Sequence, residues 1–231
     1  MTSHVGTRLI TNGLILCFDP NNSRSYPGSG TILYDLSGNE NHGTLYGSPT
    51  FSQNYLNFDG VDDYIQFPSI LLSRASAFYS IWVYVDDFTT FTSGKTVDSR
   101  ILVRGEAGYN RVLALYEGGF GFETNTNSNP NDIASNLAPG DFPHSEITAG
   151  VWFQFAMNFD NNVVYTYING EQKRTFNVSD NLQLNYIGRI QDPTNYPDYL
   201  KGRFGGFLIY DRSLSDNEIK LNYQAYLNRY I

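Results

Sequence analysis

The sequence predicts an all-β sandwich, and three observations point to that fold class. Aromatic residues make up 16% of the chain, with 18 Tyr and 16 Phe, and such rings suit the half-buried surface of a pleated sheet. The 21 Gly and 9 Pro are scattered, as turns between many short strands require. Apolar residues alternate in several segments, most clearly at the odd positions of 151–159. Without a linker-like break, we predict one domain, 1–231.

Short segments separated by turn residues define the expected strands. In chain order they cover residues 14–18, 55–58, 64–67, 80–85, 100–104, 112–116, 120–123, 151–159, 163–168, a segment from 171, 184–188 and 204–210. Two dipeptides predict hairpin turns, because two-residue turns of this type need positive φ. Asn169-Gly170 joins 163–168 to the strand that resumes at Glu171, and Asp59-Gly60 joins 55–58 to 64–67.

Only the C-terminal region has a helical pattern. Ser215 and Glu218 fit a capping box, in which each residue caps the backbone of the other. An apolar stripe follows, formed by Ile219, Tyr223, Tyr226 and Leu227. We expect one helix, over 216–228, which lies either on the sandwich or against a partner.

Charge and cysteine content exclude several classes of protein. A formal net charge of −8 argues against nucleic acid and anionic membranes as partners. No segment approaches the length of an apolar membrane span, so we expect no membrane insertion, and the N-terminus has no signal-peptide pattern. The single cysteine, Cys17, lies in the apolar run 14–18, where a buried and inert thiol is expected.

Sugar binding is the sharpest positive prediction from the loops. Lectin sites combine an aromatic face, which stacks on a pyranose ring, with polar groups that read hydroxyls. Loop residues with this chemistry are Tyr109, Asn110, Arg111, Asn125, Asn127, Tyr196 and Tyr199. Long loops in compact domains are usually functional or mobile, which draws attention to 124–146 and 191–200.

Acidic residues raise two further alternatives. Asp59, Asp62 and Asp63 could contribute oxygens to calcium, or they could shape a turn by bonding to backbone amides. Catalysis of glycoside hydrolysis needs two facing carboxylates, and no strand carries that pattern. The three histidines are dispersed, which excludes a zinc site of ordinary spacing. We therefore expect no cofactor, with a structural calcium ion at this turn as the alternative left open.

A series of motifs in order resembles a known family. The motifs are 13–19, 25–31, 34–39, 42–45, 58–64, Trp152, 165–170, 187–189, 204–210 and 214–219. This succession resembles laminin-G-like domains of the concanavalin-A-like lectin/glucanase class. The resemblance implies a jelly-roll sandwich of two antiparallel sheets with one short C-terminal helix. The family often places a calcium-binding Asp in the strand corresponding to 204–210, and this strand supplies no carboxylate.

The segment 25–31 and the Asn-Tyr-Gln-Ala helix end resemble versions found in bacteriophage structural proteins. That resemblance implies a non-enzymatic virion protein (a capsid decoration, a fibre or a tail-associated module) located on the virion. Its partners would be other virion proteins or its own copies as a homo-oligomer, and cell-surface carbohydrate. The candidate assembly contact is formed by Tyr223, Tyr226, Leu227, Tyr230 and Ile231, unless they pack on their own sandwich. The alternatives are a free-standing carbohydrate-binding module and, third, a glycoside hydrolase of the glucanase branch.

Overall fold

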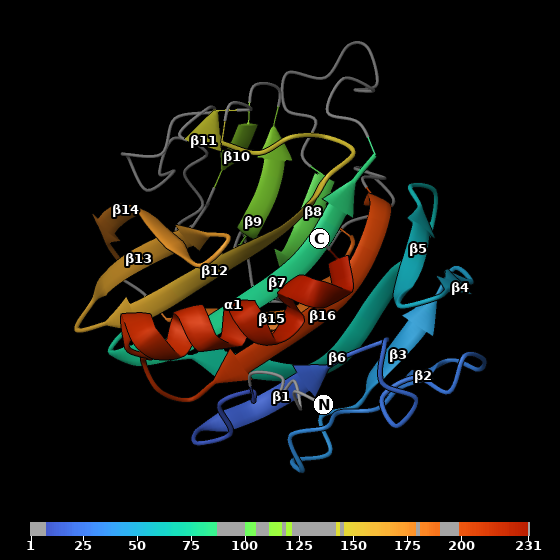
Figure 1. Ribbon diagram of the computed structural model, residues 1–231, viewed down its shortest axis with the longest axis horizontal. Helices are drawn as coiled ribbons and strands as arrows, with labels where there is room; N and C mark the ends of the chain where they lie inside the picture. The colour runs from blue at the N-terminus through green and yellow to red at the C-terminus, as the bar shows by residue number, and fades with distance from the viewer. Residues whose placement is uncertain are drawn as a thin grey trace, which may run out of the picture.

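Two antiparallel sheets and one helix make up the described part of the chain, as the sequence predicts (Figure 1). The computed structural model describes residues 8–86, 100–104, 111–116, 119–121, 142–143, 146–178, 181–189 and 199–230, with 100–143 described as backbone. Within this part of the chain, no helix is long and apolar enough to cross a membrane.

Sheet A contains the strands that lie beneath the helix. In spatial order they are β14 (Glu171–Asn177), β13 (Val163–Ile168), β12 (Trp152–Asp160), β7 (Ser76–Val85), β16 (Lys201–Tyr210), β5 (Tyr55–Asp59) and β4 (Thr50–Ser52), with β1 (Leu14–Phe18) paired to β16. The order jumps along the sequence, as it does in jelly rolls, because neighbouring strands come from distant parts of the chain.

Sheet B packs against the inner face of sheet A. Its order is β11 (Phe142–Pro143), β10 (Gly119–Gly121), β9 (Arg111–Tyr116), β8 (Arg100–Arg104), β15 (Leu182–Ile187), β6 (Tyr64–Leu72), β3 (Gly43–Tyr46) and β2 (Ile32–Leu33). The strands β2, β3, β4 and β11 are two to four residues long and are not among the strands expected from the sequence. Too few residues are present in each for alternation to show.

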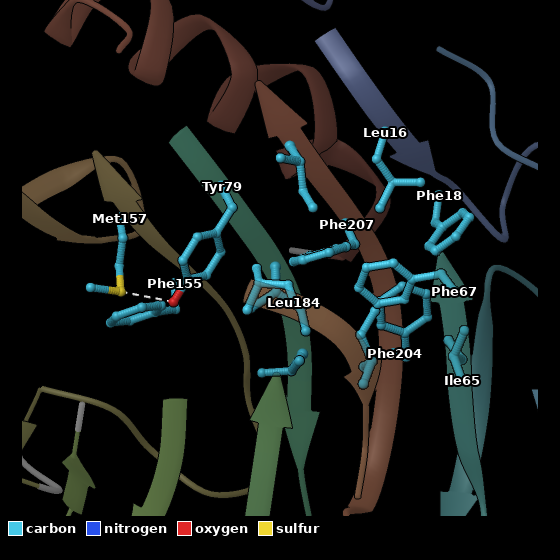
Figure 2. Close-up of a cluster of buried hydrophobic side chains, with 14 of the residues drawn as sticks. Leu16, Phe18, Ile65, Phe67, Tyr79, Phe155, Met157, Leu184, Phe204 and Phe207 are labelled. Atoms are coloured by element: carbon cyan, nitrogen blue, oxygen red, sulfur yellow. Dashed lines mark hydrogen bonds between the residues drawn. The ribbon is translucent and has the colours of Figure 1, made fainter. Parts of the chain in front are cut away.

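The core between the sheets is rich in aromatic rings (Figure 2). The ring centroid of Phe67, on sheet B, lies 5.9 Å from that of Phe18 and 5.8 Å from that of Phe207, both on the facing sheet. Tyr79 is fully buried, and its hydroxyl donates to Met157 Sδ at 2.7 Å (Figure 2). Rings at these separations stabilise the sandwich by dispersion and by edge-to-face contacts.

Strand β12 is buried on both faces, although its alternating sequence predicts that only one face is buried. The odd positions from 153 to 159 face the core as expected, whereas Val151 precedes the strand and is 51% exposed. The even positions, Gln154 and Ala156 among them, are also buried. The reason is helix α1 (Asp216–Tyr230), which covers the outer face of sheet A (Figure 1).

The helix begins where the capping box predicts. Ser215 Oγ accepts a hydrogen bond from the backbone N–H of Glu218 at 3.4 Å, and Glu218 Oε2 accepts from the backbone N–H of Ser215 at 2.9 Å. Each residue therefore satisfies a free donor of the first turn. The helix continues to Tyr230, two residues beyond the expected end, because Tyr230 packs on Trp152 of β12.

The two dipeptide turns have different outcomes. Asn169-Gly170 is a hairpin turn between β13 and β14, with φ of 54° and 75°, as predicted. Asp59-Gly60 is not, because β5 belongs to sheet A and β6 to sheet B. Asp63 Oδ2 accepts from the backbone N–H of Asp59 at 2.9 Å, so a side chain closes this turn in place of a strand ladder. The chain thereby crosses from one sheet to the other.

Candidate functional site

Register on sheet B brings three tyrosines together on its outer face. Residues 65 and 67 of β6 point into the core, so Tyr64 points outward. Tyr46 of β3 lies directly opposite Tyr64, and Tyr186 of β15 is paired with the outward position 66. Tyr199, which follows in sequence after β15, lies beside them, with its ring centroid 6.4 Å from that of Tyr64. We refer to these four residues as the tyrosine rim.

The rings of the tyrosine rim are held in defined orientations. Tyr46 and Tyr64 are stacked at 4.6 Å with an interplanar angle of 5°. Tyr186 stands edge-on to Tyr64 at 6.2 Å and 66°. Tyr46 is 41% exposed, Tyr64 and Tyr199 are half-buried, and Tyr186 is 7% exposed. The rim therefore offers an oriented aromatic surface to solvent.

Arg189 adds a fixed positive charge to the rim. Its guanidinium carbon lies 4.4 Å above the ring of Tyr64 and 4.6 Å above that of Tyr186, within the range of favourable cation–π contacts. The preceding Gly188 has a φ of +91°, and a Cβ there would lie 2.6 Å from the Phe58 ring. Glycine is therefore required at the turn that delivers Arg189 to the rim.

The turn Asp59–Asp63 borders the rim. A Cβ on Gly47, next to Tyr46, would lie 2.5 Å from the carbonyl oxygen of Asp62. The three carboxylates of the turn approach within 4.8 Å of one another. The pKa of Asp63 is raised to about 6, mainly by burial and also by the charges of Asp59 and Asp62, while its bond from the Asp59 N–H acts in the opposite direction.

The donor set of this turn meets part of what calcium requires. Calcium takes six to eight oxygens, and the turn offers one oxygen from each of three carboxylates. Two of these carboxylates already accept backbone hydrogen bonds within the turn. Asp59 Oδ1 accepts from Val61 N–H at 2.7 Å, and Asp63 Oδ2 accepts from Asp59 N–H. Lys201 of β16 lies opposite Asp59 in the ladder. The turn is thus stable through its own hydrogen bonds, and calcium binding stays a prediction.

Of the residues predicted to bind sugar, Tyr199 lies in the rim. Arg111 begins β9 of sheet B, where its backbone pairs with Arg104. The remaining five, Tyr109, Asn110, Asn125, Asn127 and Tyr196, lie outside the described residues. Sequence reasoning missed Tyr46, Tyr64 and Tyr186 because they belong to three strands, and only the register shows that they meet. The available signal was a tyrosine at or near one end of each strand.

The predicted assembly residues pack on their own sandwich in this structure. Tyr226 is almost fully buried. Tyr223 stacks on Trp82 with ring centroids 5.4 Å apart and an interplanar angle of 5°. The ring centroid of Tyr230 lies 4.4 Å from that of Trp152. Leu227 is half-buried, and Ile231 lies outside the described residues. The helix stripe therefore contributes to the fold, which is the alternative that the sequence left open.

The polar motif 34–39 also has a structural role. Asp35 Oδ1 accepts from the backbone N–H groups of Cys17 and Ser37, each at 2.8 Å. Its Oδ2 accepts from Ser37 Oγ at 2.7 Å and from Asn41 N–H at 3.1 Å. The carboxylate is fully engaged in fixing a loop to β1, so it has no free oxygen for a ligand.

Solved structures share this fold at low sequence identity. Domain 4 of AbnA, a GH43 extracellular arabinanase from Geobacillus stearothermophilus, in complex with arabinotriose, has a TM-score of 0.65 and 19% identity, over 90% of this chain and 96% of that one. Trypanosoma rangeli sialidase in complex with sialic acid has a TM-score of 0.68 and 12% identity, over 96% of this chain and 36% of the sialidase. The ligand binding domain of botulinum neurotoxin serotype D in complex with N-acetylneuraminic acid has a TM-score of 0.61 and 15% identity, over 95% of this chain and 52% of that domain.

These likenesses establish the fold. The chain spans about a third of the sialidase and about half of the neurotoxin domain, so the activities of those whole proteins do not carry over. A search of curated proteins by sequence finds no match. Residues 59–220 match the laminin G family described as the concanavalin A-like lectin/glucanases superfamily. Because the match covers most of the sequence and the two-sheet fold agrees with it, this chain belongs to the concanavalin A-like lectin/glucanases superfamily.

Proposed function

We propose that this chain is a non-enzymatic glycan-contacting protein, and that the sugar lies on the tyrosine rim. The observation that carries the proposal is the exposed ring of Tyr46, stacked flat on Tyr64. A pyranose ring stacks on such a surface, while nearby hydroxyl and charged groups bond to its hydroxyls. Tyr199 and the carboxylate of Asp62 supply polar groups at the border. The arabinotriose and N-acetylneuraminic acid bound by proteins of the same fold support this choice of ligand class.

The proposed setting is a bacteriophage virion, where the chain serves as a capsid decoration, a fibre or a tail-associated module. The support is the resemblance of segment 25–31 and of the helix end to phage structural proteins. In the structure this segment is an ordered loop, in which the buried Tyr26 donates through its hydroxyl to the carbonyl of Gly30 at 3.0 Å. Its partners would be other virion proteins, or its own copies, and the cell-surface glycan.

A free-standing carbohydrate-binding module is the second candidate. The rim favours it because all four tyrosines and Arg189 come from one copy of the chain. This candidate shares the ligand class and differs in assembly. Oligomeric state therefore separates the two candidates.

The absence of catalysis is part of the proposal. Retaining glycosidases hold two carboxyl groups about 5–5.5 Å apart across the scissile bond. Among the described residues, Asp59 and Asp63 of the turn accept from backbone amides, and Glu146 and Glu171 are paired with Arg174 and Lys173. We expect no release of reducing sugar from any polysaccharide that the chain binds; turnover that is lost in Asp62→Asn would overturn this part.

The substitution Tyr46→Ala tests the glycan site, and Tyr34→Ala is its matched control. Tyr34 is equally exposed, at 42%, but it contacts His42 and not the rim. On a glycan array followed by titration of any hit, we expect Tyr46→Ala to weaken binding by about tenfold or more, which is about 1.4 kcal/mol. Tyr34→Ala should bind like the parent. Equal loss in both variants, or an array without a hit, would contradict the proposal.

Light scattering coupled to size exclusion, with and without calcium, tests the setting. A defined trimer or larger assembly is expected for a virion subunit, since such proteins assemble with closed symmetry. A strict monomer that joins no particle would overturn the virion role and leave the free-standing module.

A further inference from the structure

A groove lies between α1 and the β13–β14 turn. Its volume is about 420 Å³, within the range of small-molecule sites. The polar and aromatic side chains that line it include Glu146, Glu171, Lys173, Lys220, Tyr223 and Gln224. None of them belongs to the tyrosine rim, so the groove is a separate feature of the molecule.

Both glutamates of the lining are paired with a cation. Two glutamates face two lysines, and Glu171 is paired with Lys173 at 3.1 Å. Glu146 is paired with Arg174 at 2.8 Å, while Lys220 makes no ion pair with the described residues. Both acids of the groove are thus already paired, and Lys220 is exposed to solvent. This favours a neutral ligand, because a charged one would be desolvated without a buried partner for its charge.

The lining supplies both hydrogen-bond donors and acceptors beside an aromatic ring. Lys220 and Gln224 stand on the outer side of α1, and Tyr223 is fixed by its stack on Trp82. Donors and acceptors next to a ring suit a polyhydroxylated ring rather than an extended apolar chain.

Unpartnered buried polar atoms lie at and behind the groove wall. Glu146 Oε2 is buried without a donor. Gln154 is fully buried with neither end of its amide bonded, and its backbone N–H donates to Oδ1 of Asn169, a lining residue, at 2.9 Å. Buried polar groups in folded proteins are nearly always paired. Because these atoms are closed off from solvent, a ligand in the groove would reach them only through a shift of the wall or through waters.

We propose that this groove is a second binding site, and that its ligand is a neutral saccharide of one or two rings. The site does not depend on the tyrosine rim, so either site can fail without the other. With both present, one copy of the chain contacts glycan at two separate places.

The test is a titration of isotope-labelled protein with maltose, cellobiose and lactose, followed by amide NMR. We expect saturable shifts at Gly170 and Lys220, which border the groove. Gln224→Trp places a bulky ring in the groove and should weaken the binding by about tenfold or more. Asn217→Trp is the matched control, because Asn217 is exposed on the same helix but does not line the groove.

Each outcome decides the proposal. Saturable shifts that are lost in Gln224→Trp, and kept in both Asn217→Trp and the rim variant Tyr46→Ala, support it. No saturable shift with any of the three disaccharides would overturn it, as would shifts that persist in Gln224→Trp. Tighter binding of galacturonic acid or glucosamine than of the neutral sugars would overturn the assignment of a neutral ligand.

Discussion

At the scale of single residues, burial determines how the polar groups behave. Asp63 keeps a raised pKa of about 6 because it is only 4% exposed and two more carboxylates adjoin it. In the unfolded chain its pKa returns to about 4. Between these two values the folded state binds more protons than the unfolded state, so this residue makes the free energy of unfolding fall as pH rises.

Asp63→Asn should remove that pH dependence. The amide oxygen can still accept the Asp59 N–H, but the charge is gone. Between about pH 4 and 7, the stability of the variant relative to the parent should rise by on the order of 1–2 kcal/mol. Urea unfolding at several pH values measures this. The exposed Asp211→Asn is the control, and parallel pH profiles for Asp63→Asn and the parent would contradict the pKa shift.

Cys17 should be inert in the folded protein. Burial, together with the neighbouring charge of Asp19, raises the pKa of its thiol to about 12. Only the thiolate reacts with disulfide reagents, and the residue is 4% exposed. We expect labelling at the rate of unfolding, with a rate that increases steeply in urea. Rapid labelling in native buffer would show that β1 opens locally.

At the scale of elements, the last turn of α1 completes the outer face of sheet A. Arg229 is paired with Asp19 of the loop after β1 at 2.6 Å. Tyr230 packs on Trp82 and Trp152, and its hydroxyl donates to the carbonyl of Gly205. Gly205 has no room for a Cβ, which would lie 2.7 Å from the Tyr230 ring. The sheet and the helix end are therefore matched in shape.

Deletion of residues 227–231 should destabilise the fold. It exposes two tryptophans and leaves the buried Asp19 without its cation, a loss of about 3–5 kcal/mol. Chemical denaturation monitored by tryptophan fluorescence measures it. Asn228→Ala, at an exposed position, is the control. If the deletion spared stability and only weakened assembly, this segment would be a partner contact.

Glu218 links the helix start to the loop before it. Its carboxylate is paired with both terminal nitrogens of Arg212, at 2.5 and 3.1 Å. This pair, together with the hydrogen bonds from the Ser215 backbone and side chain, lowers the pKa of Glu218 to about 2. A lowered pKa stabilises the fold above about pH 4, and that stabilisation is lost as the pH falls towards 2.

Glu218→Gln should therefore destabilise the protein at neutral pH by about 0.5–1 kcal/mol, since the pair is partly exposed and glutamine can still cap the helix. The difference from the parent should shrink towards zero near pH 2. Thermal unfolding across this range measures it, and a constant difference would assign the loss to capping instead of charge.

At the scale of the whole molecule, local patterns predict what depends on local physics. The bounds 163–168 and 100–104 agree with β13 and β8, and Ser215 with Glu218 marks the helix start. Asp59-Gly60 misleads, because its turn is closed by the side chain of Asp63 and joins two sheets. The tyrosine rim could not be predicted, since Tyr46, Tyr64 and Tyr186 meet only through the register of three strands.

The pairing of β1 with β16 has a consequence for synthesis. The first strand has its ladder partner nearly two hundred residues later (Cys17 lies opposite Leu208), and Ile10 donates through its N–H to Oδ1 of Asn222. While the ribosome is still translating the middle of the chain, β1 has nothing to pair with. Sheet A can close only after β16 has emerged, so folding waits for nearly the whole chain and is slow for its size. Until β16 emerges, the apolar strands already synthesised must be kept from associating with one another.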